Sequence, residues 1–114
     1  MAKFFGFAVA DSMFSSDCLI RRKRLTSEEV RDMLEKGGIE FCLNPSHGST
    51  IAAARQRFGL RVEIPEKPSV VNLDQGDSLL VMGVRGLPRL TDRHEYSEEE
   101  IASASFSFSE YTVL

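Results

Sequence analysis

Apolar and polar residues repeat along this chain with two different periods, and the alternation between them predicts a series of strands and helices. Period-2 alternation or a short dense apolar run indicates a strand, whereas apolar residues three and four positions apart indicate a helix. On this basis we expect five strands, at Lys3–Val9, Ile39–Leu43, Arg61–Ile64, Ser78–Arg85 and Phe106–Leu114.

Three helices are expected between these strands. The first has Thr26 as its N-cap with Glu29 three residues later, which is a capping box, and it ends at Gly37. A second helix is expected from about Ser49 to Phe58. A third, short helix follows the capping box that Ser97 forms with Glu100.

Strands that alternate with helices predict an α/β fold, with a mixed sheet of about five strands flanked by about three helices. The chain has 114 residues, so we expect residues 1–114 to form one domain. No apolar run reaches the roughly 20 residues of a membrane span, and we expect no membrane partner.

Composition narrows the functional classes. The net charge of −3 argues against binding to long nucleic acid, which favours a basic surface. Cys18 and Cys42 suit neither a disulfide framework nor a paired-cysteine metal site, so we expect a reducing, cytoplasmic location, in the host cell if the protein is viral. The basic residues nevertheless cluster locally, which permits a pocket for a small anion.

The segment NPSHGST carries the clearest candidate chemistry. It follows a predicted strand and opens a predicted helix, where ligands of open α/β sheets tend to bind. The free N–H groups of Gly48, Ser49 and Thr50, with the helix dipole, suit an anionic oxygen, and His47 beside them can donate a proton to a leaving oxygen. From the residues alone, a histidine in such a turn is more often a structural cap or a surface residue.

Other catalytic classes lack their motifs. The two histidines, His47 and His94, have no acidic pair at ligand spacing, so we expect no zinc, and there is no phosphate-binding glycine loop, dinucleotide fingerprint or nucleophile elbow. We therefore expect no metal and no cofactor. Cys42 as a thiol nucleophile is a weak alternative, and His94 is more typical of a solvated loop than of a ligand contact.

A set of short motifs follows one another in a specific order. They are His47-Gly48-Ser49-Thr50, Arg61-Val62-Glu63-Ile64, Arg89-Leu90-Thr91-Asp92, the Glu-rich start of the third helix and the final FSFSEYTVL. In order and spacing the chain resembles the small viral anti-CRISPR ring nucleases and their cellular relatives, which act on type III CRISPR signalling.

The resemblance implies a homodimer that binds cyclic tetra-adenylate across its two-fold axis. It further implies metal-independent cleavage to linear di-adenylates that end in a 2′,3′-cyclic phosphate. His47 would be the general acid, and Arg61 would reach the phosphates. Arg89 and Asp92 would be further catalytic residues on a lid spanning Gly83–Tyr96. We also count Ser12 of the first loop and Arg85 among the substrate-binding residues, with the first turn of the second helix.

Several residues depart from the family pattern. Ser46 precedes the histidine where relatives place glycine, Asp92 is one methylene shorter than their glutamate, and Arg85 competes with Arg89 for one role. A dimer that sequesters or senses a cyclic oligonucleotide without cleaving it therefore stays open, as does a purely structural protein. Viral and cellular origins, ring size and turnover rate also stay open.

Overall fold

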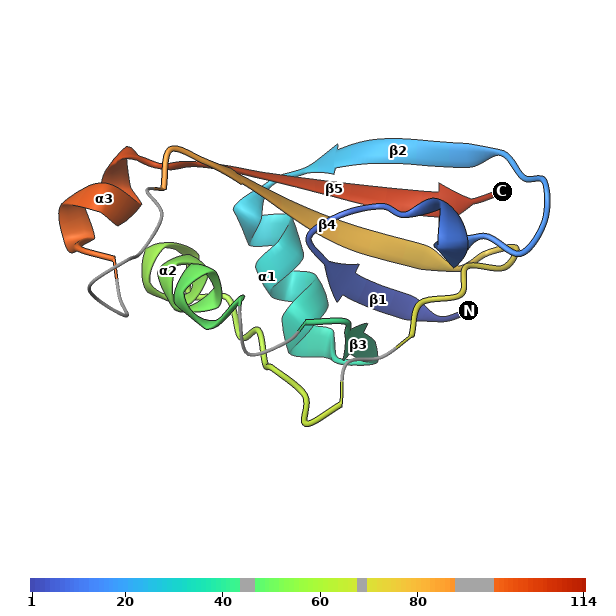
Figure 1. Ribbon diagram of the computed structural model, residues 1–114, viewed down its shortest axis with the longest axis horizontal. Helices are drawn as coiled ribbons and strands as arrows, with labels where there is room; N and C mark the ends of the chain where they lie inside the picture. The colour runs from blue at the N-terminus through green and yellow to red at the C-terminus, as the bar shows by residue number, and fades with distance from the viewer. Residues whose placement is uncertain (44–46, 68–69, 88–95) are drawn as a thin grey trace.

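Five strands form one mixed sheet in the order β2-β5-β4-β1-β3 (Figure 1). The computed structural model describes residues 1–43, 47–67, 70–87 and 96–114. The strands are β1 (Lys3–Gly6), β2 (Ile20–Leu25), β3 (Ile39–Phe41), β4 (Ser78–Arg85) and β5 (Ser105–Val113). β1 pairs in parallel with β3 and β4, while β5 runs antiparallel to β4 and β2.

The helices are α1 (Ser27–Lys36), α2 (Gly48–Phe58) and α3 (Glu98–Ser103), with a 3₁₀ turn η1 (Asp11–Met13). Both predicted capping boxes are present. The Thr26 hydroxyl accepts from the Glu29 N–H at 3.1 Å, and the Glu29 carboxylate accepts from the Thr26 N–H at 3.0 Å. Ser97 and Glu100 repeat the arrangement at the start of α3. Among the described residues, none of the helices has the length and apolar character needed to cross a membrane.

The main core lies between the sheet and the helices α1 and α2, which cover one face (Figure 1). Alternate residues of the central strands point into it because side chains alternate across a strand. Phe5, Leu80 and Met82 from the sheet meet Val30 of α1 and Ile51 of α2 there. A smaller apolar cluster on the opposite face is covered by the segment that holds Val71 and Leu73.

The fold class expected from the sequence is confirmed: one mixed five-stranded sheet with three helices. One predicted strand is wrong, because Arg61–Ile64 pairs with none of the strands that the structure describes. Its Val62 is fully buried, and the Val62 carbonyl accepts a hydrogen bond from the Arg55 guanidinium at 2.8 Å instead of joining a ladder. The sheet instead contains β2, a segment for which the sequence predicted no strand. The predicted lid is also too long, since Gly83–Arg85 belongs to β4.

Asp77 ties the N-terminus to the turn before β4, and we predict that this makes stability depend on pH. Its carboxylate accepts from the Ala2 N–H at 2.8 Å and from the Asp74 N–H at 3.0 Å, and these bonds hold the pKa of Asp77 below its usual value. The stabilisation is therefore present above the unfolded pKa, near 4, and is lost as the pH falls through the folded pKa.

Urea unfolding of the wild type and of Asp77→Asn at about pH 7 and about pH 3 tests this. We expect the variant to be the less stable protein at neutral pH and the difference to shrink in acid. The control is Asp32→Asn, an exposed acid on α1, which reports the effect of net charge alone. A difference between wild type and Asp77→Asn that stays constant with pH would contradict the prediction.

Candidate functional site

A hollow of about 420 Å³ lies where the chain leaves β1 and β3. Because these strands are parallel, their carboxyl ends meet at one edge of the sheet, the usual position of ligand sites in such folds. The described residues that line the hollow are Phe7, Ala8, Ser12, Met13, Cys42, His47, Val70 and Val71. His47 and Ser12 are the two predicted site residues that the structure brings together here.

His47 occupies the N-cap position of α2. Its side chain makes no capping hydrogen bond to the helix, so the alternative in which the imidazole serves as a cap is not what the structure shows. The ring instead meets Phe7 edge to face, with the ring centroids 4.6 Å apart and an interplanar angle of 88°. Phe7 follows β1 directly, so the sheet positions the imidazole beside the hollow.

Ser12 lies on η1, which crosses from β1 toward the segment before β4. The Leu73 N–H donates to the Met13 carbonyl at 2.7 Å, and Phe14 forms a parallel bridge with Leu73. These backbone contacts fix η1 at the rim of the hollow. Ser12 itself is exposed, so its hydroxyl is accessible to a ligand there.

Cys42 lines the same hollow but is not an activated nucleophile. Burial raises the pKa of its thiol, and Sγ donates to the Phe5 carbonyl at 2.9 Å. A thiol with a raised pKa is a poorer source of thiolate, so the geometry disfavours the thiol-catalyst alternative. The sulfur is packed tightly, because a Cβ added to Gly6 would lie only 2.7 Å from it.

The three residues of the first turn of α2 that we expected at the site, Gly48, Ser49 and Thr50, are not among the described residues that line this hollow. Gly48 and Thr50, which follow His47 closely in the sequence, are half-buried. Ser49 lines a separate hollow of about 100 Å³ between α2 and α3, together with Ala53 and Ile101. Arg61 is exposed and is not among the described residues that line the His47 hollow.

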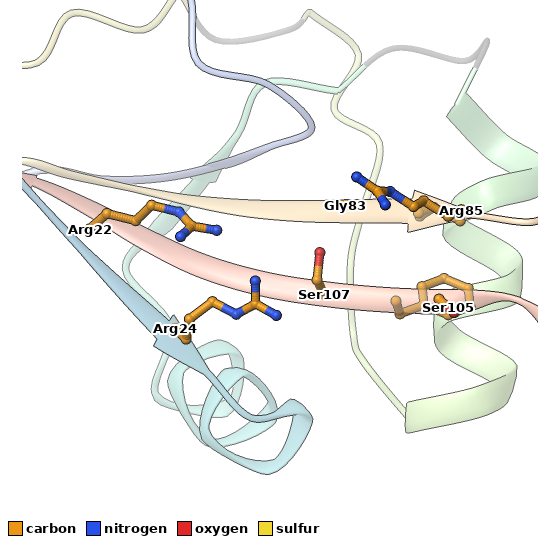
Figure 2. Close-up of a pocket in the computed structure, with 8 residues that line it drawn as sticks. Arg22, Arg24, Gly83, Arg85, Ser105 and Ser107 are labelled. Atoms are coloured by element: carbon orange, nitrogen blue, oxygen red, sulfur yellow. The ribbon is translucent and has the colours of Figure 1, made fainter.

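Arg85 lies in a third hollow, of about 500 Å³, rather than with His47. Figure 2 shows it across the same hollow from Arg22 and Arg24, two basic residues that sequence reasoning missed as site candidates. The signal was present, since a strand over IRRKRL places alternate arginines on one face. Arg89, Asp92 and His94 fall outside the described residues, and their predicted roles stay predictions.

A metal site also finds no support in the part of the chain that the structure describes. Those residues contain no group of three or more His, Cys, Asp or Glu side chains placed to hold an ion. Among the described residues that line the His47 hollow, the titratable side chains are those of His47 and Cys42, and Ser12 is a further polar residue. The arrangement therefore offers a proton donor next to a largely apolar cavity.

A scan against protein-family models and a search of curated proteins both find no match to this chain. Among solved structures, the chain is similar to B116 of Sulfolobus turreted icosahedral virus (STIV). The match covers 98% of this chain and 99% of that one, with a TM-score of 0.73 and 21% sequence identity. The two proteins share a fold over essentially their whole lengths.

Proposed function

We propose that the protein is a metal-independent ring nuclease that binds and cleaves cyclic tetra-adenylate, the second messenger of type III CRISPR systems. The observation that carries the proposal is the placement of His47. It lies at the start of α2, against the ring of Phe7, and lines a hollow at the carboxyl ends of β1 and β3 together with Ser12. The order of motifs in the sequence supports the same family of activities.

The reaction needs little from the protein. The 2′-hydroxyl of one adenylate loses its proton to solvent as its oxygen attacks the adjacent phosphorus in line, the bond from phosphorus to the 5′-oxygen breaks, and a 2′,3′-cyclic phosphate forms. His47 donates a proton to the departing 5′-oxygen. The first N–H groups of α2 stabilise the charge on the phosphate oxygens, and the apolar walls strengthen these interactions by excluding water.

The size of the site favours a symmetric dimer. A hollow of about 420 Å³ is in the range of small-molecule sites, whereas a ring of four nucleotides is considerably larger. Two copies related by a two-fold axis would each contribute one hollow to a ligand with matching symmetry. Two cuts would then yield two linear di-adenylates. The viral origin of B116, whose fold is similar, supports a viral source in which the activity removes a host defence signal.

A second candidate function is sequestration of the ring without turnover. The observation that favours it is the composition of the walls. Besides His47, Cys42 and Ser12, the described lining residues are apolar, so they supply no second acid–base group for the attacking hydroxyl. A dimer of this kind would bind the ring tightly and lower the free concentration of the signal.

Incubation of the purified protein with labelled cyclic tetra-adenylate in EDTA separates the two candidates. We expect linear di-adenylates that carry a 2′,3′-cyclic phosphate, identified by mass and by resistance to phosphatase. Tight binding of a ring that stays intact would support sequestration. The absence of both binding and cleavage would overturn both proposals. Sedimentation in parallel should show a dimer, and a strict monomer with ligand present would contradict the shared site.

A further inference from the structure

The hollow that holds Arg85 lies on the face of the sheet opposite α1 and α2. Its described lining residues are Arg22, Arg24, Gly83, Val84, Arg85, Ser105, Phe106 and Ser107, and they include no aspartate or glutamate. In Figure 2 the side chains of Arg22 and Arg24 extend from β2 toward the part of β5 that holds Ser107. Arg85 reaches the same region from β4. Three positive side chains thus border one cavity of about 500 Å³.

The basic side chains of β2 alternate between the two faces of the sheet, as its register with β5 shows. Lys23 pairs with Glu110, and it also lies close enough to Glu29 for its charge to act on that carboxylate. Arg22 and Arg24, on the other face, pair with Tyr111 and Ser109. The lysine therefore faces acids of the protein itself, whereas the cross-strand partners of the two arginines are neutral.

Two local features shape the cavity for an anion. Gly83 pairs with Ser107, and a Cβ at this glycine would lie 2.6 Å from the serine Oγ, so the glycine keeps the hydroxyl open to the cavity. The Arg22 Nε donates to the Tyr111 hydroxyl at 3.0 Å, and the guanidinium lies 5.9 Å from the centre of that ring. Tyr111 thereby orients Arg22, and within the described part of the chain the terminal N–H groups of Arg22 donate to no other residue.

We propose that this hollow binds the dianionic phosphate group of a small phosphate monoester. Guanidinium forks match the geometry of phosphate oxygens, and Arg22, Arg24 and Arg85 approach from two strands. Ser105 and Ser107 also line the cavity, and their hydroxyls can donate further hydrogen bonds. The volume of the cavity is larger than that of a bare phosphate and falls in the range of small-ligand sites, so the rest of the ester also fits. The site is separate from the His47 hollow and does not depend on ring cleavage.

Calorimetric titration tests the proposal with ribose 5-phosphate as the probe, because it lacks the adenine that the His47 hollow could accept. We expect saturable binding of ribose 5-phosphate and none of ribose. Dimethyl phosphate, a singly charged diester, should bind clearly more weakly. Inorganic phosphate distinguishes the source of the ligand: weaker binding than the ester assigns the site to an ester, and equal binding assigns it to the free anion.

Arg24→Gln and Arg85→Gln should each weaken ribose 5-phosphate binding about 10-fold or more, as expected for losing a charged hydrogen-bonding partner. Arg21→Gln and Lys23→Gln are the matched controls, since they remove the same charge from the other face of β2. We expect less than about a 2-fold change from each because their side chains point away from the cavity. His47→Ala should leave this binding unchanged.

Two results would overturn the proposal. Equal losses in the control variants and in the arginine variants would mean that diffuse positive charge, rather than a site, attracts the phosphate. Failure of ribose 5-phosphate to saturate the wild type would mean that no site of this kind exists. Neither result bears on ring cleavage, which is measured with a different ligand at the other hollow.

Discussion

His47→Ala is expected to lower the rate of cyclic tetra-adenylate cleavage about 100- to 10,000-fold, the contribution typical of a general acid. On the proposed mechanism, the substitution removes the proton donor for the departing 5′-oxygen, while the N–H groups of α2 that would hold the phosphate stay in place. Binding of the ring should therefore persist when cleavage is lost. Single-turnover rates measured with excess protein, together with binding of uncleaved ring by the variant, test both parts of this expectation.

Two further measurements distinguish proton transfer from a structural role of His47. The substitution also removes the edge-to-face contact with Phe7, which we expect to cost about 1 kcal/mol of unfolding free energy, so the variant stays folded. Added imidazole should restore part of the cleavage rate in His47→Ala, and His47→Gln should stay inactive because its amide does not titrate. A variant that cleaves at the wild-type rate would exclude His47 as the acid.

The elements that the sequence predicted correctly are those encoded by local signals. The two capping boxes, Thr26 with Glu29 and Ser97 with Glu100, involve residues three apart, and the structure contains both. Strand β4 begins and ends at the predicted residues because its apolar run is bounded by a turn and by Arg85. Such signals need no knowledge of the rest of the fold.

The errors concern which segments pair as strands, and a local sequence pattern does not encode that pairing. Arg61–Ile64 has strand-like alternation, but the carbonyl of Val62 is satisfied by Arg55 and the segment packs under α2 without a ladder. β2 carries four basic residues in IRRKRL and has low intrinsic strand propensity. It forms because β5 offers a free edge, and charged side chains are well suited to an edge strand.

The candidate site also combines features that local sequence encodes with features that depend on distant segments. His47 was predicted from its own turn and helix, and the structure places it at the expected edge of the sheet. Its contact with Phe7 joins segments 40 residues apart, which no local motif encodes. Ser49 was expected at the same anion site but faces α3, because successive residues of a helix point about 100° apart.

Phe5→Ala is expected to lower the free energy of unfolding by about 3–5 kcal/mol. The side chain is fully buried, and its ring lies 5.8 Å from that of Phe41 between the sheet and the helices. Removing it loses the transfer free energy of the ring and leaves a cavity that the close-packed core fills only in part. A loss of this size is a large share of the roughly 5–15 kcal/mol that stabilises a typical domain.

Urea unfolding at neutral pH measures this loss, with Leu19→Ala as the matched control. Leu19 is also a large apolar residue but is 75% exposed, so we expect its truncation to change stability by less than about 0.5 kcal/mol. β1 lies between β3 and β4 in the sheet, and the Cys42 thiol donates a hydrogen bond to the Phe5 carbonyl. The cavity should therefore loosen the edge that carries His47, and cleavage by the folded fraction should fall as well. Equal effects of the two substitutions would mean that β1 does not anchor the core.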